Sequence, residues 1–203
     1  MPPWLSVVIP TIGRDSLQMT FDALGAQPEC AGVEVLVVAD TYGGNTDELT
    51  RARLRTELAG FNWLEHDAGF HCVGQPQRTH GARQAHAPWI WFGQDDNVPA
   101  KDSLALIEQT IDAQEHARPL FFRMRTFWGS EVWHEPMLSI GNIDADCLVF
   151  PRAIAKQVEW GLRYEGDYDA AKHAYQLSDG DVGWIDEVVS VARPQPGQFW
   201  WRT

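Results

Sequence analysis

The sequence predicts an α/β protein built on a parallel sheet. Two apolar runs, residues 5–9 and 33–39, are each followed by a helix-forming stretch, and an aromatic run at 89–92 ends beside two carboxylates. Strands that alternate with helices are typical of parallel sheets with right-handed crossovers. Ligands of such sheets bind beyond the carboxyl ends of the strands, so the residues after each run are the first candidates for a site.

Length and composition favour a single domain. The 203 residues are 44% hydrophobic and include 10 Trp, enough to bury one sizeable core. The formal charge of -12 argues against nucleic acid or an anionic membrane as the main partner, so an anionic ligand would need local Arg residues or a metal. Three widely spaced cysteines without a CxxC motif fit a reducing compartment. Neither a signal-peptide pattern nor an apolar run of about 20 residues is present, so we expect a soluble, cytoplasmic protein.

The first strand, residues 5–9, is a short apolar run that Pro10 is expected to stop. Asp15 and Gln18 resemble a capping box, which would open a helix that ends at Gly25. The helix carries apolar residues on one face, as expected for an element that packs on a sheet.

The second strand, residues 33–39, ends in Asp40 and is followed by a turn-rich segment at 43–45. Residues 46–48 are Thr, Asp and Glu, which suit the N-terminus of a helix that runs to about Gly60.

The third strand, residues 89–92, ends near the adjacent carboxylates Asp95 and Asp96. Neighbouring carboxylates repel each other, so the pair is unfavourable unless a cation lies beside it. A Mg²⁺ or Mn²⁺ ion that holds a diphosphate would meet this need, because both ions take a few carboxylate oxygens and complete their shell with phosphate and water. The alternative is a strand-to-helix turn in which an Asp caps the helix.

The second half of the chain continues the same alternation. We expect a packing helix at 101–114, a strand at 120–125, a helix that opens at 166 and ends near 180, and a terminal strand at 184–191. The last residues, 198–203, are too few for a further domain.

Four segments together resemble family 2 glycosyltransferases of the GT-A fold. They are the first strand with Pro10-Thr11, the strand that ends in Asp40, the segment 81–85 around Arg83, and the segment 92–96. The resemblance implies a Rossmann-like, mixed and mainly parallel sheet flanked by helices, in one domain that spans residues 1–203. About 1–98 would form the nucleotide-sugar half and about 99–203 the acceptor half.

In such an enzyme the strand ends would hold the nucleotide. Asp40 would accept a hydrogen bond from the N–H of uracil or a similar base, and Pro10 and Thr11 would complete the base pocket. Arg83 would pair with a phosphate or a base carbonyl through its planar guanidinium. The alternative for Arg83 is an exposed helix charge.

The family's Asp-x-Asp motif reads Gln94-Asp95-Asp96 in this chain, so its first Asp is replaced. The family's Asp-Asp-Gly-Ser turn likewise keeps only Asp40. Asp95 would accept hydrogen bonds from ribose hydroxyls, and Asp96 would hold the Mn²⁺ or Mg²⁺ that bridges the diphosphate. Such an ion stabilises the charge that develops on the leaving nucleoside diphosphate.

A loose group of histidines and a cysteine precedes the third strand, but its spacing matches none of the common zinc arrangements. Its members are His66, His71, Cys72, His80 and His86. Ordinary loop and helix residues are the simpler interpretation.

The catalytic base is expected at the start of the helix that opens at residue 166. In the resembling family a Glu-Asp pair stands there, and in this chain Gly166 replaces the Glu while Asp167 matches the Asp. An inverting transfer needs a carboxylate to remove the proton of the acceptor hydroxyl, and we assign this role to Asp167, with Glu165 and Asp169 as alternates. The other interpretation of Asp167 is a helix N-cap.

The acceptor side is expected to include Trp128, Trp133 and Asn142. Trp rings stack well on the apolar faces of sugars, although both Trp residues would equally suit a core. Asn142 belongs to a segment that resembles the acceptor side of the same enzymes.

The sequence therefore predicts metal-dependent, inverting transfer of a sugar from a nucleoside diphosphate sugar, most simply a UDP-sugar, to a glycan or other hydroxyl acceptor. A sugar-1-phosphate nucleotidyltransferase is one rival, although residues 5–20 lack its Gly-rich, basic start. A non-catalytic carbohydrate-binding protein is another, and it would not need Asp96 or Asp167.

Overall fold

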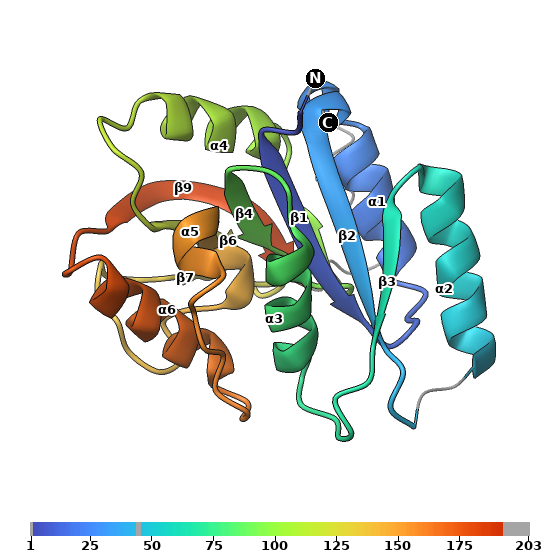
Figure 1. The fold of residues 1–203 in the computed structure, drawn as a ribbon. Helices are drawn as coiled ribbons and strands as arrows, with labels where there is room; N and C mark the ends of the chain where they lie inside the picture. The colour runs from blue at the N-terminus through green and yellow to red at the C-terminus, as the bar shows by residue number, and fades with distance from the viewer. Residues whose placement is uncertain (1, 44–45, 193–203) are drawn as a thin grey trace.

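The computed structural model describes residues 2–43 and 46–192. Within these residues the strands form one nine-stranded sheet in the order β3-β2-β1-β4-β8-β6-β9-β5, and β7 pairs with β6 outside this path (Figure 1). The expectation about residues 198–203 lies outside the described residues, as does part of the turn at 43–45. No helix among the described residues is long and apolar enough to cross a membrane.

The first half of the chain builds the parallel part of the sheet, in which β3, β2, β1 and β4 all run in one direction. Its strands are β1 (Leu5–Thr11), β2 (Val33–Asp40), β3 (Asn62–His66) and β4 (Trp89–Phe92). Its helices are α1 (Leu17–Gly25), η1 (Pro28–Gly32), α2 (Thr46–Ala59) and α3 (Gln75–Gln84).

The second half adds antiparallel strands, because β8 pairs antiparallel with both β4 and β6, and β5 pairs antiparallel with β9. Its strands are β5 (Asn97–Pro99), β6 (Leu120–Arg125), β7 (Glu131–Val132), β8 (Leu148–Pro151) and β9 (Gly183–Ala192). Its helices are α4 (Ser103–Asp112), η2 (Ala145–Cys147), α5 (Arg152–Ala155) and α6 (Gly166–Leu177). The prediction of a mixed α/β sheet flanked by helices is confirmed.

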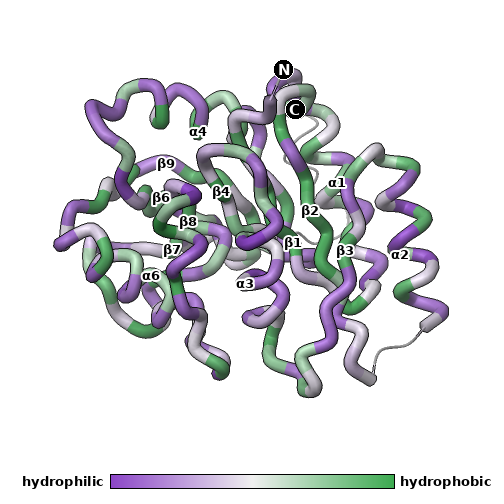
Figure 2. Tube along the Cα trace, viewed as in Figure 1, coloured by the Kyte–Doolittle hydropathy of each residue, from purple (hydrophilic) through white to green (hydrophobic). Residues whose placement is uncertain are grey.

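Two hydrophobic cores lie on opposite faces of the sheet, because successive strand side chains point to opposite sides. Val8 of β1 belongs to a core that includes residues of α3, α5 and α6, whereas its neighbours Val7 and Ile9 belong to a core that includes residues of α1 and α4. Figure 2 shows hydrophobic colour along the central strands, while α3 is largely hydrophilic. Gln77 and Arg78 of this polar helix are nevertheless buried, and both line the cleft described below.

Pro10 does not stop β1, which continues to Thr11. Val8 accepts a hydrogen bond from the backbone N–H of Gly93, so Val8 and Pro10 turn their backbone groups toward the β4 side. Since β4 has ended at Phe92, the missing N–H of proline removes no hydrogen bond from the ladder.

The expected capping box of α1 is also absent from the described structure. Ser16 occupies the N-cap position without a side-chain cap bond, and Gln18 donates to Asp22 at 2.8 Å instead. Asp15 forms an ion pair with Arg55 at 3.2 Å. A distant partner for Asp15 and a partner one helical turn away for Gln18 therefore replace the capping bonds that the sequence pattern suggested.

Candidate functional site

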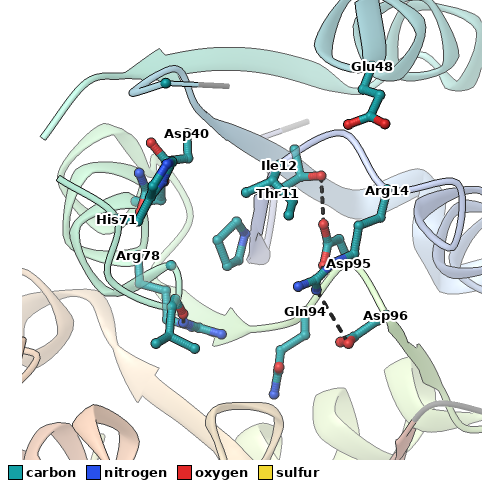
Figure 3. A pocket seen from close by; sticks show the side chains of 15 residues that line it. Thr11, Ile12, Arg14, Asp40, Glu48, His71, Arg78, Gln94, Asp95 and Asp96 are labelled. Carbon is teal, nitrogen blue, oxygen red and sulfur yellow. Dashed lines mark hydrogen bonds and ion pairs between the residues drawn. The ribbon is translucent and has the colours of Figure 1, made fainter. Parts of the chain in front are cut away.

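A cleft of about 440 Å³ opens at the carboxyl ends of β1, β2 and β4. Figure 3 shows Asp40 and His71 on one side of it and Arg14, Asp95 and Asp96 on the other. The lining residues include five that the sequence analysis had assigned to the donor or the metal, namely Pro10, Thr11, Asp40, Asp95 and Asp96. The parallel topology brings them together because each follows or ends a neighbouring strand.

The two adjacent carboxylates share a cation from the protein itself. Nη1 of Arg14 lies 2.8 Å from Oδ1 of Asp95 and 3.3 Å from Oδ2 of Asp96. Thr11 donates from Oγ1 to Oδ2 of Asp95 at 2.8 Å. Burial raises the pKa of Asp95, while the positive charge of Arg14 and the bond from Thr11 act in the opposite direction. Arg14 therefore relieves the repulsion that made a cation necessary at this position.

The carboxylates fit a metal that is shared with phosphate rather than one held by protein alone. Within residues 2–43 and 46–192, no group of three or more His, Cys, Asp or Glu side chains could hold a metal ion. Asp95 and Asp96 nevertheless line the cleft together, and the side chain of Asp96 is 17% exposed. Mg²⁺ sites of this type use one or two carboxylates and complete the shell with substrate phosphates and water.

Asp40 lies at the end of β2 and is only 4% exposed. Its Oδ2 lies 2.9 Å from Nδ1 of His71, and its Oδ1 accepts a hydrogen bond from the backbone N–H of Tyr42 at 3.1 Å. The rings of Tyr42 and His71 meet edge to face, with centroids 5.2 Å apart. Both oxygens of the predicted base acceptor thus already have partners in the protein.

Arg78 contributes a buried cation to the cleft that was not predicted, whereas Arg83, which was predicted to bind the donor, is exposed and does not line the cleft. Arg78 donates from Nη1 to the carbonyl of Val73 at 3.0 Å and to Oε1 of Gln75 at 3.2 Å. Its guanidinium also lies 5.2 Å from the centroid of Trp160. None of these partners carries a negative charge.

Burial lowers the pKa of Arg78, and the negative charges of Asp144, Asp146, Asp167 and Asp95 oppose this effect. Its Nε has no hydrogen-bond partner among the residues that the structure describes. A desolvated guanidinium with a free donor at a cleft is well suited to bind an anionic or carbonyl-bearing ligand.

Topology provides the signal that distinguishes Arg78 from Arg83. A crossover helix that leaves one parallel strand starts at the carboxyl-end edge of the sheet and ends at the opposite edge. Arg78 lies in the first half of α3, near the cleft, and Arg83 lies in its last turn, near the far edge.

Asp167 is the second residue of α6, and its Oδ1 accepts a hydrogen bond from the backbone N–H of Tyr168 at 2.8 Å. Burial, and then the negative charge of Asp144, raise the pKa of Asp167 to about 6, against the effect of Arg78. The N-cap position of α6 belongs to Glu165, which makes no side-chain cap bond. Asp167 therefore does not act as the N-cap considered from the sequence.

The alternate base Asp169 is occupied by an ion pair. Its two oxygens accept hydrogen bonds from Nε and Nη2 of Arg163 at 2.7 and 2.6 Å. These bonds lower the pKa of Asp169, so it is a weaker proton acceptor than Asp167.

A polar chain connects the cleft to the surroundings of Asp167. Gln94, which lines the cleft, donates from Nε2 to Oδ1 of Asp144 at 2.7 Å. The negative charge of Asp144 in turn raises the pKa of Asp167. Asp146, two residues after Asp144, is buried and accepts hydrogen bonds from Asn97 at 2.7 Å and Ser190 at 3.0 Å. Burial and the charge of Asp144 raise the pKa of Asp146 well above its usual value.

The expected acceptor residues have three different environments. Trp128 is 80% exposed. Trp133 lies in the core instead, only 4% exposed, with the guanidinium of Arg123 4.5 Å from its ring centroid and Trp184 against it edge to face. Its ring faces are therefore not available to a sugar.

Asn142 is buried and holds a loop together. Its Oδ1 accepts from the backbone N–H of His134 at 2.8 Å, and its Nδ2 donates to the carbonyls of Glu135 at 2.9 Å and Met137 at 2.8 Å. The amide oxygen and nitrogen of Asn142 therefore already bond to the backbone of its own loop, without an acceptor sugar.

The fold is similar to several solved structures. One is the crystal structure of S. aureus TarS 1-349, which is 20% identical in sequence and superposes with a TM-score of 0.72. The match covers 98% of the present chain and 62% of the TarS chain. The crystal structure of S. aureus TarS 1-349 in complex with UDP-GlcNAc is 16% identical and has a TM-score of 0.67. The match covers all of the present chain and 61% of the TarS chain. A third structure is the mannosyltransferase PcManGT from Pyrobaculum calidifontis in complex with GDP-Man and Mn²⁺, with a TM-score of 0.67 and 16% identity. The match covers all of the present chain and 60% of the PcManGT chain.

At these identities the likeness establishes the fold, which is GT-A-like, and the chain spans about three fifths of the length of these structures. The sequence matches no protein-family model and no curated protein.

Proposed function

We propose that the protein is a glycosyltransferase that moves a sugar from a nucleoside diphosphate sugar, most simply a UDP-sugar, to a hydroxyl acceptor with inversion. The observation that carries the proposal is the cleft at the strand ends, where Asp40, Asp95 and Asp96 lie around the buried guanidinium of Arg78. Solved structures of the same fold that contain UDP-GlcNAc or GDP-Man support a nucleotide sugar as the donor.

The donor would occupy the cleft, with about residues 1–98 forming its site and about 99–203 the acceptor side. Arg78 would contact the diphosphate or a base carbonyl, in place of the Arg83 suggested by the sequence. Thr11, Pro10 and Asp40 would enclose the base end, and Asp95 would face the ribose.

A divalent metal is part of the proposal. Asp96, with Asp95 beside it, would hold Mn²⁺ or Mg²⁺, which supplies positive charge to the leaving diphosphate when bound. The complex of PcManGT with Mn²⁺ supports such an ion in this fold. Arg14 would keep the carboxylates in place and reduce their repulsion whether or not the ion is bound.

Asp167 would act as the general base. The acceptor oxygen attacks the anomeric carbon as the bond from that carbon to the diphosphate oxygen breaks. The acceptor proton passes to the carboxylate of Asp167, and the bonding electrons leave with the nucleoside diphosphate. A carboxyl pKa of about 6 suits this step, because the group is mostly ionised at neutral pH and yet more basic than an ordinary Asp.

The experiment that tests the proposal measures release of nucleoside diphosphate from a panel of UDP-sugars and GDP-sugars, with Mn²⁺ and with a set of glycoside acceptors. We expect release with at least one donor, faster with an acceptor than without. Donor binding without turnover in every combination would contradict the enzyme and favour a carbohydrate-binding protein instead.

A further inference from the structure

Arg14 lies against the two carboxylates that are proposed to hold the metal. Its Nη1 is 2.8 Å from Oδ1 of Asp95 and 3.3 Å from Oδ2 of Asp96, so one guanidinium nitrogen bridges the pair. Arg14 belongs to the loop after β1, whereas the two aspartates follow β4. The carboxylate pair therefore has a counter-ion from the protein before any ligand binds.

Both oxygens of Asp95 accept hydrogen bonds from the protein. Oδ1 accepts from Arg14, and Oδ2 accepts from Oγ1 of Thr11 at 2.8 Å. The residue is buried, which strengthens electrostatic interactions at its carboxylate. A metal ion on Oδ1 of Asp95, or on Oδ2 of Asp96, would share that oxygen with the guanidinium. Arg14 therefore opposes the binding of a free ion by charge repulsion.

The local charge also gives a free ion little attraction. Two carboxylates and one guanidinium leave a single negative charge at the pair. Gln94 stands where the resembling family has a further Asp, and its amide donates to Asp144 instead. Arg78 adds a second positive charge within electrostatic range of Asp95. A divalent cation thus meets a site whose negative charge is already largely compensated.

The other acidic residues that line the cleft are Asp40 and Glu48. Oδ2 of Asp40 lies 2.9 Å from Nδ1 of His71. In the view of Figure 3, Arg14 lies between Glu48 and the two aspartates that follow β4. Neither residue therefore adds a carboxylate on the side of Arg14 where the pair lies.

A nucleoside diphosphate supplies the negative charge that the pair lacks. Its phosphate oxygens are ligands for Mn²⁺ or Mg²⁺, and their charge offsets that of the guanidinium. Arg14 lines the cleft with its side chain 49% exposed, so it can contact the same phosphates. Arg14 attracts the anion but repels the ion when the ion arrives alone.

We propose that Arg14 weakens the binding of free Mn²⁺ or Mg²⁺ at Asp95 and Asp96, so that the ion binds together with the nucleoside diphosphate and not before it. This inference rests on the proposed function. It requires that loss of the positive charge has opposite effects on a cation and on an anion. A purely structural arginine would instead weaken both ligands when it is replaced.

The test compares Arg14→Gln with the same substitution at Arg53. Arg53 is the matched control, because it also pairs with two carboxylates, Glu57 at 3.4 Å and Glu65 at 3.7 Å, but does not line the cleft. Mn²⁺ binding without nucleotide is measured by the EPR signal of the free hydrated ion, which is lost when the ion binds. Calorimetry measures the affinity of each protein for UDP and GDP in EDTA. The Mn²⁺ titration of wild type is then repeated with the nucleotide that binds.

We expect Arg14→Gln to bind Mn²⁺ without nucleotide roughly 10-fold more tightly than wild type, or more; the gain is limited because Arg14 is half exposed and partly screened by water. The same substitution should weaken UDP or GDP binding in EDTA roughly 10-fold, through loss of a charged contact to phosphate. Arg14→Lys, which keeps the charge, should bind Mn²⁺ as weakly as wild type does. Arg53→Gln should change neither affinity. In wild type, the nucleotide should tighten Mn²⁺ binding roughly 10-fold or more.

Equal or weaker Mn²⁺ binding by Arg14→Gln would overturn the inference, and nucleotide binding by wild type would then leave the proposed function intact. Wild type that binds Mn²⁺ equally well with and without nucleotide would overturn it too. A tighter Mn²⁺ site in Arg14→Gln, with no nucleotide bound by wild type, would support the effect of Arg14 on the ion and contradict the proposed function. If Arg14→Gln does not fold, Arg14→Met is measured in its place, and failure of both to fold would assign Arg14 to the fold and refute this role.

Discussion

Replacement of Asp167 by Asn is expected to make the protein more stable and much less active. Its pKa is raised from 3.8 to about 6, so the folded protein binds the proton more tightly than the unfolded chain does. Stability therefore decreases as pH rises through the window from about 4 to about 6 and changes no further above it. A difference of about two pKa units corresponds to about 3 kcal/mol.

Asn has no charge to bury and can still accept the hydrogen bond from Tyr168. Asp167→Asn should therefore raise the free energy of unfolding at pH 7.5 by up to about 3 kcal/mol and leave it nearly unchanged at pH 4. Denaturant titrations at the two pH values measure this difference. Transfer should fall roughly 100-fold or more, since Asn cannot take the acceptor proton.

The pH profile of the wild type provides a second measurement of the same group. We expect kcat to rise through pH 6 as Asp167 ionises and to level off above it. Asp169→Asn is the matched control, because that carboxylate pairs with Arg163 and should leave kcat unchanged. Wild-type turnover in Asp167→Asn, or equal stability changes at pH 4 and pH 7.5, would refute the assignment.

Three further predictions concern the cleft and the loop beside it. Arg78→Ala should weaken UDP binding, measured by calorimetry, by roughly 10- to 100-fold, the range for loss of a charged hydrogen bond, whereas Arg83→Ala should leave the affinity unchanged. Equal effects of the two substitutions would contradict the assignment of the anion site to Arg78. Asp96→Ala should abolish the difference in UDP affinity between Mn²⁺ and EDTA, and a wild type that shows no such difference would argue against the metal. Asn142→Ala should lower stability by about 1 to 3 kcal/mol through its lost loop bonds without altering UDP affinity, and a selective loss of acceptor binding instead would restore it as an acceptor residue.

Much of the parallel half could be predicted because its signals are local. Apolar strands, the helices between them and the carboxylates after them fixed where Thr11, Asp40 and Asp95 would meet. β3 was not expected, since Asn62–His66 is a short and partly polar edge strand without the apolar run that marks β1 and β2. Edge strands need less hydrophobic sequence because one side faces solvent.

The remaining differences depend on contacts between distant residues. The choice between Arg78 and Arg83 required the direction of α3 relative to the sheet, and the burial of Trp133 depended on Arg123 and Trp184. The pairing of Arg14 with Asp95 joins residues 81 positions apart. No local pattern contains this information, so tertiary packing decides which polar residues face the cleft.

The most direct test of the proposed reaction is the anomeric configuration of its product. Wild type, Mn²⁺, the donor that is turned over and a glycoside acceptor are incubated together, and the new glycosidic linkage is examined by ¹H NMR. The general-base role of Asp167 predicts a glycoside whose anomeric configuration is opposite to that of the donor, and loss of that product in Asp167→Asn. A glycoside with retained configuration, or one formed at the wild-type rate by Asp167→Asn, would contradict inverting transfer by this site.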